Sequence, residues 1–102
     1  MGYDRWVGAP PMPGRPRIDV VETPDEVMSK IEGRHGVSYD DVDEVLSGAF
    51  SYSWSFEDAR GWRLYVQGRA RSGNLLKVVL RLVDSRDGVW RLRPAFWTNR
   101  PL

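Results

Sequence analysis

The sequence predicts an α+β fold in which two N-terminal helices pack on one face of an antiparallel sheet of about four strands. Two observations predict it. Apolar residues recur at helical spacing between residues 24 and 47, and from Ala49 onward apolar and polar residues alternate. Helices followed by a run of strands are typical of α+β proteins, because each helix must bury its apolar stripe against the apolar face of the sheet.

A short strand and a first helix are expected at the start of this fold. The β-branched residues of segment 18–21 favour a strand. Thr23 as N-cap and Pro24 at the first helical position give a strong helix start, and the helix is expected over residues 24–34. Gly36 should end it, because glycine adopts a left-handed backbone at little cost.

The second helix is expected over residues 39–47. Ser38 is a natural N-cap, and Asp41 three residues later completes a capping-box-like start. The apolar residues of the segment fall on one helical face and acidic side chains occupy the rest; the apolar residues are Val42, Val45 and Leu46.

Four strands are expected after the helices, at residues 50–56, 62–69, 75–83 and 89–97. The third is almost continuously apolar and is therefore the best candidate for the central strand. Pro94 indicates that the last strand reaches a sheet edge or bends. Alternation places Leu76, Val78, Leu80 and Leu82 on one face of the third strand, and Trp90, Leu92 and Phe96 on one face of the fourth, opposite Arg91, Arg93 and Trp97.

The composition indicates one domain preceded by a tail. Residues 1–17 hold four prolines and three glycines, which predicts a flexible arm, and the domain should span residues 18–102. The absence of cysteine and the single histidine exclude a disulfide, a thiolate zinc site and a multi-histidine metal site. No apolar run reaches membrane-spanning length, so we expect a soluble cytoplasmic protein without a membrane partner or a cofactor.

Charge is distributed unevenly along the chain. Residues 19–58 contain 11 acidic and two basic residues, whereas residues 60–102 contain ten basic and two acidic ones. Such asymmetry suggests a polyanion partner for the basic half, and the alternative is that helix carboxylates pair with strand arginines. If the helices cover the leucine face, the opposite face collects cations around an aromatic ring, as single-stranded RNA requires: Arg63, Tyr65, Arg69, Lys77, Arg81, Arg91 and Arg93.

One motif resembles a known family. Residues 34–42 read RHGVSYDDV, which is similar to the KHGVSFEEA signature of BrnT-type toxins, and the resemblance extends over roughly residues 18–96. Those toxins are small ribonucleases with a RelE-like fold, encoded beside an antitoxin. The resemblance implies the toxin of a type II toxin–antitoxin pair, which cleaves single-stranded RNA or mRNA, inhibits translation and is held by a cognate antitoxin covering its basic face.

Cleavage of RNA without a metal requires groups that stabilise the phosphorane and groups that move protons. Lysine and arginine suit the first task, and the resemblance assigns it to basic residues of the first helix and of the sheet. His35, Tyr65 and Lys30 are candidates for the second. The catalytic candidates are therefore Lys30, His35, Tyr65, Arg69, Arg91 and Arg93, and the RNA-binding candidates are Arg34, Arg63, Lys77 and Arg81.

The last strand departs from the family pattern. The family reads close to IRIISARKA, whereas residues 90–97 read WRLRPAFW, so Phe96 stands where the catalytic arginine would be. Either Arg93 serves from the neighbouring position, or the chain is a non-catalytic RelE-like module that binds RNA or protein. His35 also has an alternative role, since a histidine beside a helix C-terminus can cap free carbonyls.

Overall fold

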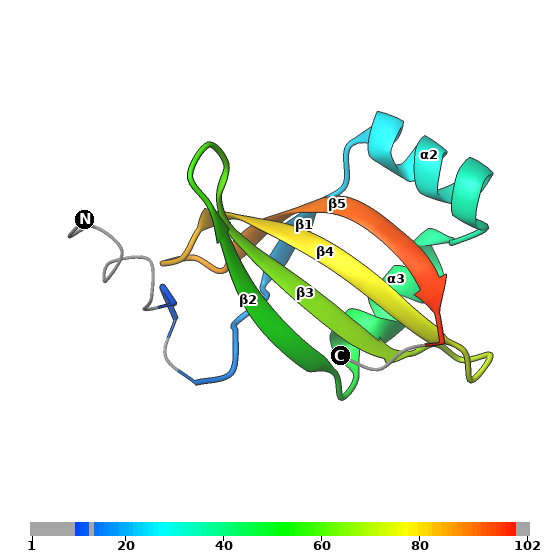
Figure 1. The fold of residues 1–102 in the computed structure, drawn as a ribbon. Helices are drawn as coiled ribbons and strands as arrows, with labels where there is room; N and C mark the ends of the chain where they lie inside the picture. Colours follow the sequence, from blue (N-terminus) through cyan, green and yellow to red (C-terminus); the bar gives the residue numbers. More distant parts are fainter. Residues whose placement is uncertain (1–9, 13, 100–102) are drawn as a thin grey trace.

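The structure of the protein is a computed structural model, and it describes residues 10–12 and 14–99. Two helices and five strands build an α+β fold, as the sequence predicts (Figure 1). The strand order across the sheet is β1-β5-β4-β3-β2. In chain order the elements are β1 (Val20–Glu22), α2 (Asp25–His35), α3 (Tyr39–Ser47), β2 (Ser51–Glu57), β3 (Gly61–Arg69), β4 (Leu75–Asp84) and β5 (Val89–Thr98).

The sheet is mixed rather than wholly antiparallel. Strands β2 to β5 form antiparallel neighbours, as expected. The short strand expected at 18–21 forms at β1 instead and adds to the edge of β5 in parallel, with Val20 opposite Val89. A parallel pairing is possible because the chain crosses through two helices and three strands before β5 returns beside β1.

The start of α2 differs from the expectation. Pro24, with φ −58° and ψ 140°, is the N-cap residue, and Asp25 is the first helical residue. The predicted Thr23 cap is wrong, because the extended ψ of Pro24 delays the helical backbone by one residue and no side chain caps this end. The end agrees: Gly36 adopts φ 63°, and its N–H donates to the carbonyl of Glu32 at 3.2 Å.

The capping box of α3 is confirmed. The Ser38 hydroxyl accepts from the Asp41 N–H at 3.1 Å, and the Ser38 N–H donates to Asp41 Oδ2 at 2.9 Å. The helix buries Val42 and Val45 toward the sheet. Both ends of the link between the helices are therefore fixed, by Gly36 on one side and by the capping box on the other.

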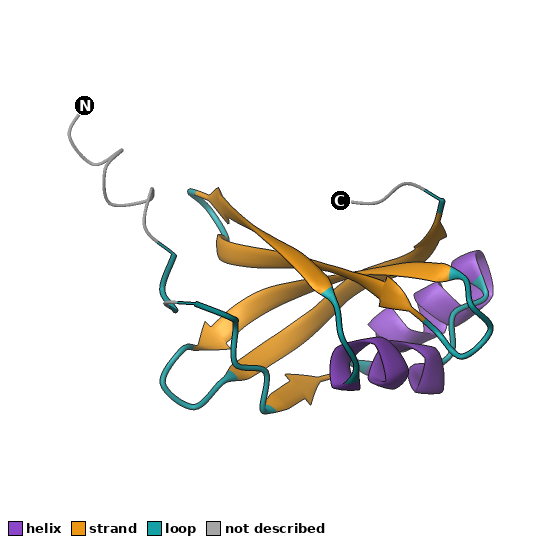
Figure 2. Cartoon of the chain, turned by 90° about the horizontal axis from the view of Figure 1, so that it is seen from below, coloured by secondary structure: helices purple, strands orange, loops and turns teal. Residues whose placement is uncertain are grey.

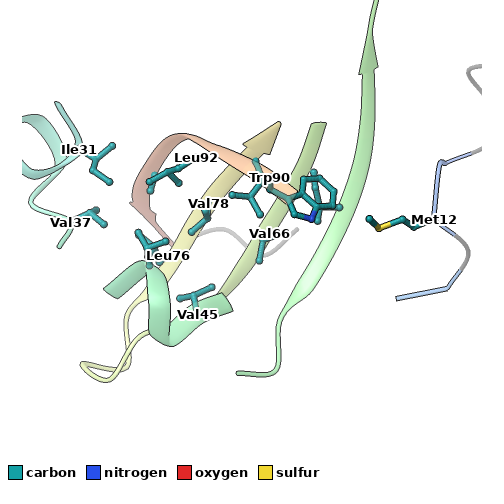
Figure 3. Packing of buried hydrophobic residues seen from close by; sticks show 13 residues of the cluster. Met12, Ile31, Val37, Val45, Val66, Leu76, Val78, Trp90 and Leu92 are labelled. Atoms are coloured by element: carbon teal, nitrogen blue, oxygen red, sulfur yellow. The ribbon is translucent and has the colours of Figure 1, made fainter. Parts of the chain in front are cut away.

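Both helices lie on the same side of the sheet, and we call the other side the open face (Figure 2). The helix side holds the core, in which Leu76, Val78 and Leu80 of β4 are fully buried, as the alternation predicts. Figure 3 shows Ile31 of α2 and Val45 of α3 among the residues of this cluster. Burial of a leucine or valine side chain contributes about 1.5–3 kcal/mol, so this layer is the main stabilising element.

The described part of the N-terminal arm packs against the core. Met12 belongs to the buried cluster beside Trp90 (Figure 3). The Trp90 Nε1–H donates to the carbonyl of Arg17 at 2.9 Å, which satisfies the polar atom of a fully buried indole. A flexible arm is predicted for the whole of residues 1–17, of which residues 1–9 and 13 lie outside the described residues.

A bulge in β5 reverses the predicted faces at its end. Val78 pairs with Ala95 and Leu80 with Leu92, so Arg93 and Pro94 together oppose the single residue between the two β4 positions. The side-chain alternation shifts by one residue beyond this point. Phe96 consequently lies on the open face opposite Lys77, and Trp97 lies on the helix side opposite Leu76; both predicted placements are wrong.

Candidate nucleic-acid interface

Three arginines lie side by side on the open face. Arg63 of β3 is in register with Arg81 of β4, and Arg81 is in register with Arg91 of β5. We call these residues the arginine row. All three are partly buried by their neighbours. Residues opposite each other on antiparallel strands are about 4.5–5.5 Å apart at Cβ, so the guanidinium groups share one small region of the surface.

Acidic residues neutralise the two ends of the arginine row but not its centre. Arg63 Nε lies 2.8 Å from Glu57 Oε1 in an ion-pair contact without hydrogen-bond alignment. Arg91 donates from Nε and Nη2 to Glu22 Oε1 at 3.0 and 2.9 Å. The Arg81 side chain has no hydrogen bond or ion pair with any residue of 10–12 and 14–99. Arg81, at the centre of the row, is therefore the arginine whose charge is least neutralised and the one most available to a bound anion.

A second cationic group lies where α2 packs beside β5. A cavity of about 200 Å³ opens there, which we call the α2–β5 pocket, and its lining residues are Val27, Lys30, Ile31, Arg34, His35, Arg93 and Pro94. Lys30 and Arg34 are four residues apart and so share one face of α2. The β5 bulge contributes Arg93 and Pro94 from the sheet. Helix and bulge thus bring four basic side chains to one cavity.

The basic side chains of the α2–β5 pocket form no hydrogen bonds or ion pairs with other described residues. This holds for the side chains of Lys30, Arg34, His35 and Arg93, whose backbones belong to α2 and β5. The backbone N–H groups of Gly36 and Val37 donate to the carbonyls of Glu32 and Ile31. The His35 side chain forms no hydrogen bond with a described residue, so it does not cap this helix. Its ring instead lies 6.0 Å from that of Phe96, measured between centroids.

The remaining predicted residues divide between the two groups and a turn. Tyr65 and Lys77 lie on the open face, opposite Val79 and Phe96 respectively. Arg69 lies apart, since its Nη1 donates to the carbonyl of Gly73 at 2.7 Å and so closes the β3–β4 turn. Arg93 follows Arg91 by two residues on β5, which makes it the link between the arginine row and the α2–β5 pocket.

The sequence interpretation missed Gln67. It lies on the open face of β3, opposite Lys77, yet its residue surface is only 5% exposed. Its Oε1 is buried and has no hydrogen-bond partner. A neutral polar residue at an alternating strand position gives no sequence signal of this burial. Its shared parity with Arg63, Tyr65 and Arg69 is the one feature that could have drawn attention to it.

The arrangement suits an extended polyanion. Arginine and lysine bind phosphate oxygens through charge-assisted hydrogen bonds, and an aromatic ring beside them can stack on a base. No group of three or more His, Cys, Asp or Glu side chains that could hold a metal ion occurs among the described residues. No described helix has the length and apolar character needed to cross a membrane.

Comparison with known proteins supports the architecture. No protein-family model and no curated protein sequence matched this chain. Its fold is similar to that in a 1.1 Å crystal structure of the Brucella abortus ribonuclease toxin BrnT, with a TM-score of 0.55 and 14% sequence identity over 80% of this chain and 100% of that chain. At this identity the likeness shows a shared fold alone. The chain therefore has the α+β fold of a BrnT toxin, as its sequence predicts.

Proposed function

We propose that the protein is the toxin of a type II toxin–antitoxin pair, which cleaves single-stranded RNA without a metal ion and thereby inhibits translation. One observation carries this proposal: four basic side chains without hydrogen-bond or ion-pair partners among the described residues meet in the α2–β5 pocket, beside the arginine row. The shared fold with a ribonuclease toxin supports it. A cognate antitoxin would cover the open face with acidic or apolar segments.

The proposed reaction is attack of the 2′-hydroxyl on the adjacent phosphate. The 2′-oxygen forms a bond to phosphorus as the bond to the 5′-oxygen breaks, which leaves a 2′,3′-cyclic phosphate and a 5′-hydroxyl. Lys30 and Arg93, both in the α2–β5 pocket, would stabilise the extra charge of the phosphorane. His35 in the same pocket, or Tyr65 on the open face, would take the proton of the 2′-hydroxyl or return one to the 5′-oxygen.

The other predicted catalytic residues have weaker positions. Arg91 is held by Glu22, and Arg69 by the carbonyl of Gly73. Both can still bind an RNA phosphate after exchanging these partners, and we assign them to binding rather than to the reacting phosphate. Arg34 of the α2–β5 pocket, Arg63 and Arg81 of the arginine row, and Lys77 complete the proposed binding surface.

A second candidate function is a non-catalytic module that binds RNA or protein. Phe96 favours it, because this apolar ring lies on the open face beside His35, at the position where the family resemblance expects a catalytic arginine. Arg93 must act in its place if the protein cleaves RNA. The two candidates share the binding surface and differ in turnover, so a cleavage assay separates them.

The test is incubation of purified protein with single-stranded RNA in excess EDTA. We expect cleavage products that end in a 2′,3′-cyclic phosphate. The Lys30→Ala and Arg93→Ala variants should each be slower by on the order of 10²–10³, by analogy with removal of one oxyanion-hole donor. Arg60→Ala is the matched control, since Arg60 is an exposed cation in the β2–β3 turn, outside both groups. Its rate should equal that of the wild type.

Two outcomes would change the proposal. Loss of all cleavage in EDTA would contradict the metal-free mechanism. If neither the wild type nor its variants cleave RNA, although all of them bind it, the result would establish the non-catalytic module instead.

A further inference from the structure

Gln67 is the one buried polar or charged residue in the described part of the chain. It lies on the open face of β3, with Ser51 of β2 on one side and Lys77 of β4 on the other. Tyr65, two residues earlier on the same strand, shares this face and is partly exposed. The buried amide therefore lies within the surface proposed to bind RNA.

The carbonyl oxygen of this amide has no donor. Gln67 Oε1 is buried without a hydrogen-bond partner, although a neighbouring Lys77 carries three donors. A buried acceptor that loses its water without gaining a donor destabilises the folded protein, so such groups are rare and call for a reason. The position of Gln67 on the open face is consistent with one such reason, namely that a bound ligand supplies the missing donor.

We propose that Gln67 reads one base of the bound RNA strand by accepting a base N–H at Oε1, after the side chains that cover this buried oxygen in the free protein move aside. This inference rests on the proposed function. A phosphate cannot fill the role, because an ionised phosphodiester has acceptor oxygens and no donor, whereas base edges carry N–H groups. Bases of a single strand expose these edges and can also stack on an aromatic ring, which Tyr65 supplies nearby.

Adenine is the expected base. A glutamine amide matches its edge with two hydrogen bonds, in which N6–H donates to Oε1 and N7 accepts from Nε2. Lys77 and the arginine row would hold the phosphates on either side of this base. Sequence preference would then come from Gln67, and most of the affinity would come from the cations, as is general for nucleic-acid recognition.

The test compares the wild type with Gln67→Met in binding to 2′-O-methyl decamers of adenine, cytosine, uracil and purine, the last lacking the N6 amine. The 2′-O-methyl group prevents cleavage by 2′-hydroxyl attack and removes the ribose hydroxyl as an alternative donor. We expect the wild type to bind the adenine decamer roughly tenfold more tightly than the purine decamer, which lacks the N6–H donor. Gln67→Met should bind all four with similar affinity.

Thermal unfolding supplies the second readout. Gln67→Met removes an unpartnered buried amide while keeping the length of the side chain, so its melting temperature should rise by a few degrees. The matched control is Ser53→Ala, an exposed polar residue on the same face of β2, in register with Tyr65. This variant should change neither the base preference nor the melting temperature.

The outcomes separate this inference from the proposed function. An unchanged preference in Gln67→Met, or a lower melting temperature, would overturn the role of Gln67, since the second result means that the amide has an internal partner such as Lys77. A preference for another base that Gln67→Met abolishes would keep Gln67 as the reader and replace adenine. Absence of binding to every decamer at low salt would instead overturn the proposed function, and this inference with it.

Discussion

Arg81 and Arg91 are neighbours in the arginine row, but their surroundings differ. Arg91 donates two hydrogen bonds to Glu22, whereas Arg81 has no partner among the described residues. Repulsion between Arg81 and the arginines on both sides is therefore not offset by a carboxylate of its own. A phosphate would relieve this repulsion, so Arg81 should contribute more to RNA binding than Arg91, which must first exchange Glu22 for the ligand.

We expect Arg81→Ala to weaken RNA binding and to reduce its salt dependence by roughly one unit of slope, because each phosphate contact releases bound counterions. Arg91→Ala should have a smaller effect. The measurement is fluorescence anisotropy of a labelled single-stranded RNA over a salt titration, with Arg60→Ala as control. Identical titration curves for Arg81→Ala and the wild type would show that the arginine row does not contact RNA phosphate.

At the level of elements, the capping box of α3 is separate from the RNA surface. Ser38 and Asp41 are joined by three hydrogen bonds at the N-terminus of this helix. The helix packs against β3 and β4. Both helices lie on one side of the sheet (Figure 2), whereas strand alternation places the arginine row on the open face. Stability and RNA binding can therefore be perturbed independently.

Ser38→Ala should reduce the free energy of unfolding by about 1 kcal/mol, because an orphan N–H of the first helical turn loses its acceptor. Urea unfolding followed by circular dichroism measures this loss. RNA affinity below the unfolding transition should stay at the wild-type value. A fall in affinity in the still-folded variant would mean that α3 takes part in binding.

The elements themselves could be predicted because their signals are local. Helical spacing around Val42 and alternation along β4 were sufficient to place the helices and strands and to identify the core face of Leu76. The β5 bulge could not be placed, since it is defined by pairing with β4, and this reversed Phe96 and Trp97. Pro94 indicated a bend in β5 but did not show that two residues of β5 would oppose one residue of β4.

The sequence predicted many of the residues that form the candidate site, but it did not predict how all of them are arranged in space. Strand parity correctly placed Arg63 and Arg81 on one face, because alternation holds wherever a strand is regular. The α2–β5 pocket arises from packing between segments that are distant in sequence, so no local pattern showed that Lys30 and Arg93 would line one cavity. The burial of Gln67 likewise depends on its neighbours across the sheet.

At the scale of the whole molecule, the acidic and basic parts of the chain pair only in part. Three ion pairs connect them, and these are Glu22–Arg91, Glu44–Arg71 and Glu57–Arg63. The other described cations after residue 59 have no acidic partner: Arg60, Arg69, Lys77, Arg81, Arg86 and Arg93. Internal pairing thus accounts for some of the charge asymmetry. Of the remaining cations, Lys77 and Arg81 lie on the open face and Arg93 lines the α2–β5 pocket, whereas the other three lie at turns between strands.

The two cationic groups should bind one RNA strand together. Arg93 connects them along β5, so a strand long enough to reach both gains the second contact at a high effective concentration. We expect affinity to rise steeply with RNA length and then to level off once a strand reaches both groups. The measurement is a series of uncleavable 2′-O-methyl oligonucleotides of increasing length, titrated at constant salt.

Variants of each group show whether this length dependence reflects joint binding. Arg81→Ala removes a contact from the arginine row, and Arg34→Ala removes one from the α2–β5 pocket. Each should weaken the long oligonucleotides far more than the shortest ones, because a short strand can occupy the intact group. Equal weakening at every length would mean that one group alone binds RNA. The other group would then be free for a protein partner such as the antitoxin, and its cations would meet acidic side chains there rather than phosphates.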